Sequence, residues 1–296
     1  MEPIPAGQQG RVRREGNDIG NDTGEDTGNS IGHHAGNGVD DTAEDRSSPD
    51  REAADREAAD PHCLRPGEAR GLLARAPWRR LVVLGDLAVE RAPEPVEGYG
   101  ARPWYDRVAS ALDEAAEDVA YLNLLGRREV RVAQVRSSQL PAALAFRGDL
   151  ALVCCGTAYT PDETFGRYGL TAELVRIVAP LRDAGCDVVL VGAHPLAAWP
   201  GLPASRRERA AEQQGRVSEQ ARAVALRHGT LYVAPDTHRP DAAAAVWSRD
   251  RPRPNSRGHA ALAAAVVRAL GARTAAPAPA PDPADAGSGR GPVRPP

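Results

Sequence analysis

Short apolar runs alternate along the middle of the chain with longer segments in which apolar residues recur at helical spacing. The apolar runs predict five β-strands, at residues 81–85, 119–124, 150–155, 187–191 and 231–234. The longer segments predict helices at residues 104–117, 135–145, 172–184, 206–227 and 256–270. Nearly continuous apolar strands joined by helices are typical of a parallel sheet buried on both faces. The pattern therefore predicts an α/β fold, a three-layer α/β/α sandwich with a five-stranded parallel sheet.

The two ends of the chain differ in composition from this middle part. Residues 1–75 are rich in Gly, Asp, Asn, Glu and Arg, show almost no apolar periodicity and include a repeated pentad at 50–59. Residues 273–296 form an Ala/Pro and Gly/Arg tail. Such compositions predict solvated, disordered segments. We therefore expect a disordered arm at 1–75, a folded domain at 76–272 and a disordered tail at 273–296.

Charge and cysteine content argue against several classes of function. The formal net charge is −3 and the arginines are interspersed with acids, so no nucleic-acid partner is expected. No apolar segment approaches membrane-spanning length, and the chain starts without the basic and then apolar pattern of a secretory signal. The four cysteines lack zinc-ligand spacing. We expect a cytoplasmic protein with no metal, no cofactor and no membrane span.

The end of the first predicted strand carries the most informative motif. The run at 82–87 reads Val-Val-Leu-Gly-Asp-Leu, so that Gly85, Asp86 and Leu87 form the turn after the strand. This run resembles the opening block of the SGNH/GDSL hydrolases, in which a Gly-Asp-Ser turn presents the serine that attacks an ester or acyl carbonyl. A leucine side chain cannot be deprotonated, so Leu87 excludes covalent catalysis from this position.

Further blocks that resemble the family follow in the family's order. Residues 103–108 resemble the start of the first helix in actinobacterial members, and residues 150–156 resemble the strand that leads into a Gly-Gly-Asn-Asp block. Residues 246–262 resemble the closing block, which carries Asp-x-x-His before a Gly-His helix. The resemblance covers residues 81–270 and implies a flavodoxin-like SGNH-hydrolase fold, with its site beyond the carboxyl ends of the strands.

Carried over residue by residue, the resemblance implies a degenerate catalytic site. Arg253 stands three residues after Asp250, where the family has its general-base His, and a guanidinium stays protonated at physiological pH. Thr157 and Ala158 stand in the block that carries the oxyanion-binding Asn. Asp250 remains, but it has no His to orient.

The family positions are expected to line one pocket, formed by Asp86, Leu87, Gly126, Gly156, Thr157, Ala158, Asp250 and Arg253. Asp86 is expected to hold its turn by accepting backbone hydrogen bonds. Gly126 is a candidate for the second-block glycine donor, although the family spacing falls nearer Arg128. Arg253 is expected to form an ion pair with Asp250 or to bind an anionic ligand.

Three functions are consistent with these residues. The first is a catalytically inactive pseudoenzyme that binds a small acyl or ester-like ligand or a protein partner. The second is an ester or acyl hydrolase with relocated residues, in which Cys155 or Thr157 is the nucleophile and His194 acts near Asp250; His259 is expected to pack or cap at the last helix. The third is a structural subunit that stacks on an active hydrolase. The sequence does not predict the oligomeric state.

Overall fold

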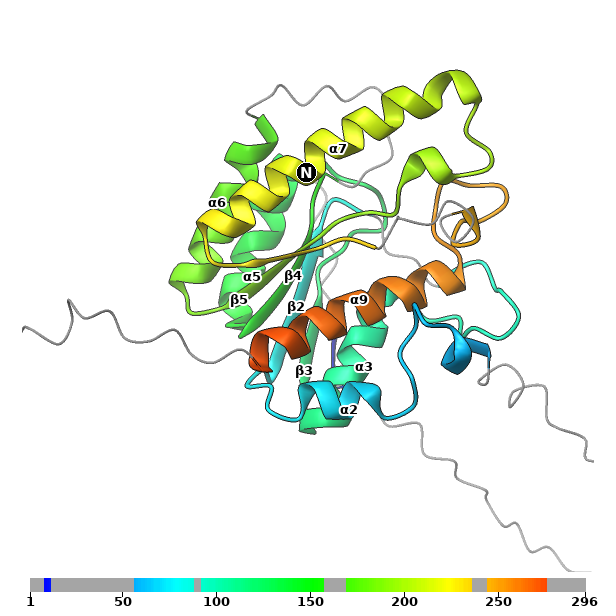
Figure 1. Cartoon of the computed structure of the whole chain (residues 1–296). Coiled ribbons are helices and arrows are strands. Elements are labelled where there is room, and N and C mark those ends of the chain that lie inside the picture. Colours follow the sequence, from blue (N-terminus) through cyan, green and yellow to red (C-terminus); the bar gives the residue numbers. More distant parts are fainter. Residues whose placement is uncertain (1–7, 12–55, 88–91, 157–168, 236–243, 276–296) are drawn as a thin grey trace, which may run out of the picture.

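The structure of the protein is a computed structural model that describes residues 8–11, 56–87, 92–156, 169–235 and 244–275. These residues contain a six-stranded sheet with the order β1-β3-β2-β4-β5-β6 (Figure 1). Five of the strands are parallel, which confirms the predicted sheet, and β1 adds an antiparallel strand beside β3. The strands span Gln8–Arg11 (β1), Arg80–Gly85 (β2), Ala120–Asn123 (β3), Leu150–Cys154 (β4), Asp187–Val191 (β5) and Leu231–Val233 (β6).

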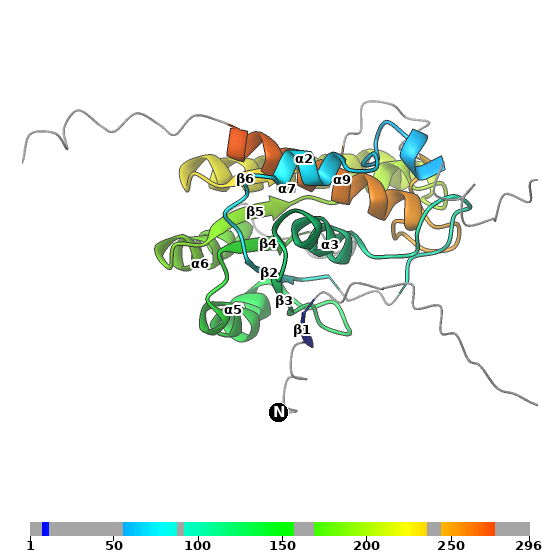
Figure 2. The ribbon, with the colours of Figure 1, turned by 90° about the horizontal axis from the view of Figure 1, so that it is seen from below.

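Helices cover both faces of the sheet, as the sequence predicts (Figures 1 and 2). One face carries α2 (Glu68–Leu73), α3 (Trp104–Ala116) and α9 (Ser256–Ala275). The other face carries α5 (Leu140–Phe146), α6 (Gly169–Asp183) and α7 (Ala204–Arg227). A short 3₁₀ helix, η2 (Leu196–Ala198), follows β5. None of the helices in the described part of the chain is both long and apolar enough to cross a membrane.

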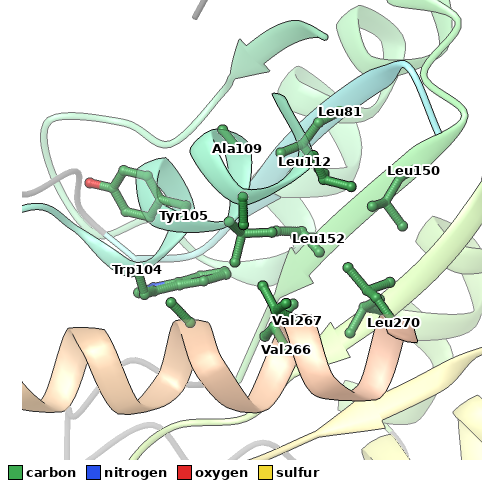
Figure 3. Close-up of a cluster of buried hydrophobic side chains, with 14 of the residues drawn as sticks. Leu81, Trp104, Tyr105, Ala109, Leu112, Leu150, Leu152, Val266, Val267 and Leu270 are labelled. Carbon is green, nitrogen blue, oxygen red and sulfur yellow. The ribbon is translucent and has the colours of Figure 1, made fainter. Parts of the chain in front are cut away.

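The two sides of the sheet form two apolar cores. Successive side chains of β2 alternate between them: Leu81 and Val83 pack with α2, α3 and α9, whereas Val82 and Leu84 pack with the helices of the opposite face. Figure 3 shows the first core, in which side chains of α3 and α9 meet those of β2 and β4. Because both faces are buried, β4 is apolar at every position, and β2 and β5 carry no polar residue after their first position.

The folded part begins earlier than the predicted boundary at residue 76. Residues 56–59 are helical, Cys63 is fully buried, and Leu73 of α2 belongs to the first core. The prediction of a disordered arm is therefore wrong for residues 56–75, and β1 extends the sheet with residues 8–11. The last helix reaches residue 275, beyond the predicted limits at 270 and 272. Residues 12–55 and 276–296, predicted to be disordered, lie outside the described residues.

The helix predicted at 135–145 begins earlier, at residue 132, and consists of three consecutive segments. They are α4 (Val132–Gln134), the π-helical turn η1 (Val135–Gln139) and α5. The hydroxyl of Ser138 donates to the carbonyl of Gln134 at 2.6 Å, where it competes with the regular helical ladder. The wider π turn places Gln139 in the core beside the end of β2, a position that matters for the site.

Candidate functional site

The turn after β2 is held tightly against the end of β4. The backbone N–H of Asp86 donates to the carbonyl of Cys154 at 3.0 Å, and the N–H of Gly156 donates to Oδ2 of Asp86 at 2.5 Å. Asp86 is 1% exposed, so its carboxylate joins two strand ends from inside the protein. This is the loop-holding role expected of Asp86.

At position 85, the last residue of β2, only glycine fits. A Cβ atom on Gly85 would lie 2.2 Å from the carbonyl oxygen of Cys154 and 2.3 Å from its Sγ. Both contacts are far inside van der Waals separation, and one is with backbone, so β2 and β4 approach this closely because Gly85 has no side chain.

Gln139 is a site residue that the sequence analysis missed. Its Oε1 accepts from the N–H of Gly85 at 2.8 Å, and its Nε2 donates to the carbonyl of Gly85 at 2.9 Å. The paired strand β3 has already ended at this level, so the Gln139 amide replaces a neighbouring strand. The sequence feature that could have identified Gln139 is that it is the one amide side chain within the helix predicted at 135–145.

A pocket opens beyond the turn, at the carboxyl ends of the strands, where the sequence predicts the site. Its empty volume is about 610 Å³, including the part open to solvent. Leu87 and Arg253, two of the predicted residues, are in its lining, whereas Asp250 and Gly126 are not. The described lining residues are Leu87, Trp104, Tyr105, Leu125, Glu129, Cys154, Val191, Gly192, Ala193, His194, Arg253, Pro254, His259 and Leu262.

The predicted ion pair between Asp250 and Arg253 is not formed. A guanidinium nitrogen of Arg253 lies 3.8 Å from a carboxylate oxygen of Glu129, and the Asp250 carboxylate lies 3.7 Å from Arg251. The conformation of this loop explains why the pair does not form. The N–H of Ser248 donates to the carbonyl of Arg253 at 2.8 Å and closes a tight loop, on which the Asp250 side chain is exposed to solvent. Glu129 and Arg253 are each about one-third exposed, so their pair contributes at most about 1 kcal/mol.

The imidazole of His194 is buried in the lining of this pocket. Its Nε2 lies 3.0 Å from the carbonyl oxygen of Gly258, which can only accept, so Nε2 carries the proton. The ring is 2% exposed and packs edge-on against Trp247. Burial lowers the pKa of His194 to about 4. The side chain is therefore neutral at physiological pH, with Nδ1 as its acceptor atom.

The low pKa of His194 predicts a loss of stability in mild acid. Below the ordinary His pKa of 6.5 the unfolded chain takes up a proton that the folded chain does not bind until about pH 4, so stability falls as the pH falls through this window. Between pH 7 and pH 5 we expect a loss of about 2 kcal/mol from this group. Urea unfolding at both pH values, with wild type and His194→Gln, measures it; equal losses in the two proteins would contradict the assignment.

Cys155, the cysteine considered as a nucleophile, and its neighbour Cys154 are buried on opposite faces of the sheet. Cys154 lines the pocket together with His194, whereas Cys155 belongs to the core beneath α6 and α7 and lines a separate hollow there. Burial raises the pKa of both thiols well above its usual range, because desolvation disfavours the thiolate. The described geometry therefore does not bring Cys155 to His194.

The remaining predicted residues occupy different places around the turn. His259 is buried near the start of α9, and its Nδ1 accepts the N–H of Trp104 at 3.0 Å, so it caps the start of α3 and not the last helix. Gly156 lines the hollow on the Cys155 side of the sheet, and Gly126 lies in the loop between the lining residues Leu125 and Glu129. Thr157 and Ala158 lie outside the described residues. No group of three or more potential metal ligands occurs among the residues that the structure describes.

Comparison with known proteins identifies the family. Residues 72–261 match the GDSL-like Lipase/Acylhydrolase family. The chain belongs to this family. The match includes the strand-end turn at Gly85 and all the described lining residues of the pocket except Leu262.

Solved structures similar to this chain have low sequence identity to it. LAE5, an alpha/beta hydrolase enzyme from the metagenome of Lake Arreo in Spain, is 17% identical, with a TM-score of 0.50 over 65% of this chain and 95% of its own. Axe2, an acetylxylan esterase from Geobacillus stearothermophilus, is also 17% identical, with a TM-score of 0.46 over 65% of this chain and 94% of its own. A search of the curated proteins gives no match.

Proposed function

We propose that this GDSL-family chain lacks the hydrolytic chemistry of an esterase and uses its pocket to bind a small acyl or ester-like ligand. The observation that carries the proposal is the position of Leu87. The turn after β2, where the resemblance expects a serine nucleophile, presents a hydrocarbon side chain, and this side chain lines the pocket. A nucleophile at this position is the first requirement of the covalent mechanism.

The other polar groups of the pocket support the same conclusion. Arg253 stands where a base is expected, and its guanidinium is beside Glu129 rather than beside a nucleophile. His194 is neutral, but its Nε2 proton is directed at the carbonyl of Gly258. The described lining residues include no serine and no threonine, and the Cys154 thiol has a raised pKa. A deprotonated nucleophile beside a base is therefore not assembled from these residues.

The form of the pocket supports a small ligand over a stacked protein partner. A structural subunit would have little need for an open pocket at the strand ends, whereas this one is open and lined mostly by apolar side chains. Leu87, Leu125 and Leu262 provide apolar walls for a hydrocarbon chain. Arg253 and Glu129 offer a polar edge for an ester or acyl head group.

The wild-type protein is expected to hydrolyse p-nitrophenyl butyrate no faster than buffer does. Leu87→Ser should be equally inactive, because a restored hydroxyl would have Arg253 and not a base in the closing block. Release of p-nitrophenolate by wild type, Leu87→Ser and His194→Ala is the measurement. Turnover in wild type that disappears in His194→Ala would establish a relocated hydrolase and reject the proposal.

Ligand binding is tested separately by saturation-transfer NMR with ethyl butyrate. Wild type should give a ligand signal, and Leu87→Trp should abolish it because the larger ring fills the pocket. Gly215→Ala, on the exposed side of α7, is the matched control and should bind as wild type does. An ester signal that survives in Leu87→Trp would show that the ligand does not enter this pocket.

A further inference from the structure

A second pocket adjoins the first, and His194 lines both of them. It lies between α9 and the N-terminal segment at Pro61 and His62, and its empty volume is about 1030 Å³, including the part open to solvent. The described lining residues are Pro61, His62, His194, Pro195, Pro235, Val246, Arg257, Ala261, Ala265 and Arg268. The proposed function of the first pocket does not involve these α9 and N-terminal residues, so we call this second one the α9 pocket.

The floor of the α9 pocket is one face of α9. Arg257, Ala261, Ala265 and Arg268 follow one another at intervals of four, four and three residues, which places them along one side of a helix. The two alanines leave space in the middle of the floor, and an arginine stands at each end. A ligand on this surface would therefore find apolar contacts flanked by positive charge.

The two arginines differ in how their hydrogen bonds are used. Arg268 donates to both carboxylate oxygens of Glu68 and to the carbonyls of Pro61 and Cys63, at distances from 2.7 to 3.2 Å. These bonds hold the segment at 61–63 and the start of α2 against α9. The role of Arg268 is therefore to build the wall of the α9 pocket.

The guanidinium of Arg257 uses only its Nε donor in the hydrogen bonds described for it. Its Nε donates to Oδ2 of Asp60 at 2.8 Å, and this buried carboxylate also accepts from the hydroxyl of Tyr99 and the N–H of His62. Within the described part of the chain, the two terminal nitrogens of Arg257 donate to no protein acceptor. A guanidinium has five N–H groups in a rigid plane, and the terminal pair suits the two oxygens of a carboxylate. The Asp60 bond fixes the orientation of the plane.

The charge of the lining favours an anion. Arg257 and Arg268 are positively charged, and the described lining residues include no aspartate and no glutamate. Val246 and the prolines at 61, 195 and 235 complete an apolar surround. We propose that the α9 pocket binds a small organic acid, whose carboxylate accepts from the terminal nitrogens of Arg257 while its apolar chain lies over Ala261 and Ala265.

Titration calorimetry with hexanoate tests this site, with 1-hexanol as the neutral probe. Wild type should bind hexanoate at least tenfold more tightly than hexanol. Arg257→Gln should weaken hexanoate binding at least tenfold, and Arg257→Lys should weaken it less, because Lys retains the charge but lacks the planar pair of donors. Arg216→Gln, on the exposed side of α7 and outside the described lining of both pockets, should leave hexanoate binding unchanged.

A second variant keeps the test valid if the loss of Arg257 unfolds the protein by leaving Asp60 buried without its cation. Ala265→Leu narrows the floor of the α9 pocket without touching the Arg257–Asp60 pair, and it should also weaken binding at least tenfold. Three outcomes would reject the site: no hexanoate binding to wild type, equal binding of hexanol, or binding that Arg253→Gln abolishes and Ala265→Leu does not change. The last outcome would place the acid in the first pocket.

Discussion

Gly85→Ala is expected to destabilise the protein by about 3 kcal/mol or more. The added methyl group would lie 2.2 Å from the Cys154 carbonyl oxygen, and this oxygen cannot move away because it accepts the N–H of Asp86 in the turn. Relief would require β2 and β4 to separate at the floor of the pocket. The free energy of unfolding from urea denaturation, followed by circular dichroism, measures the effect.

Gly215→Ala provides the control for the same chemical change. Gly215 lies in α7, is exposed, and has no atom within 4 Å of the position of an added Cβ. Because alanine favours a helix more than glycine does, this substitution should stabilise the protein by about 0.5–1 kcal/mol. If Gly85→Ala were as harmless as Gly215→Ala, the close approach of β2 and β4 would not exist in solution.

Gln139→Leu is expected to cost about 4 kcal/mol, since it leaves two backbone groups of Gly85 without their partner. Leucine is close in size to glutamine, so the loss would reflect the missing hydrogen bonds more than a cavity. The same urea denaturation measures the change in unfolding free energy.

Gln134→Leu is the matched control for the glutamine substitution. Gln134 is exposed and only caps the first turn of α4 by accepting the N–H of Arg131 at 2.9 Å, so its loss should cost less than about 1 kcal/mol. A similar cost at both positions would show that the buried amide of Gln139 does not support the strand end.

Much of the fold could be predicted because the central strands are almost continuously apolar. The runs around Val82, Leu152 and Val189 match β2, β4 and β5 closely, since strands buried on both faces leave a continuous apolar signal. The segment from residue 56 to 75 was missed for the opposite reason. It is held by polar contacts such as those of Asp60 and Arg268, which have no periodicity in the sequence.

The pocket could be predicted in part. Leu87 and Arg253 lie in its lining because strand ends and the closing block meet at the same edge of a parallel sheet. The partner of Arg253 could not be predicted, because it depends on how the loops at 129 and 248–253 are folded. Gln139 was overlooked because the π turn that carries it inward does not follow the 3.6-residue repeat on which helix prediction rests.

The family match and the unit that can fold do not have the same limits. A fragment cut at residues 72 and 261 would begin inside α2 and end within the second turn of α9. It would lack Val266, Val267 and Leu270, which cover the sheet, and the Arg268 bonds that fasten the segment at 61–63 to α9. The part of this sheet face that α9 covers would then be exposed to water. Recombinant fragments should therefore run at least from residue 56 to residue 275, because the ends of this interval are fastened to each other.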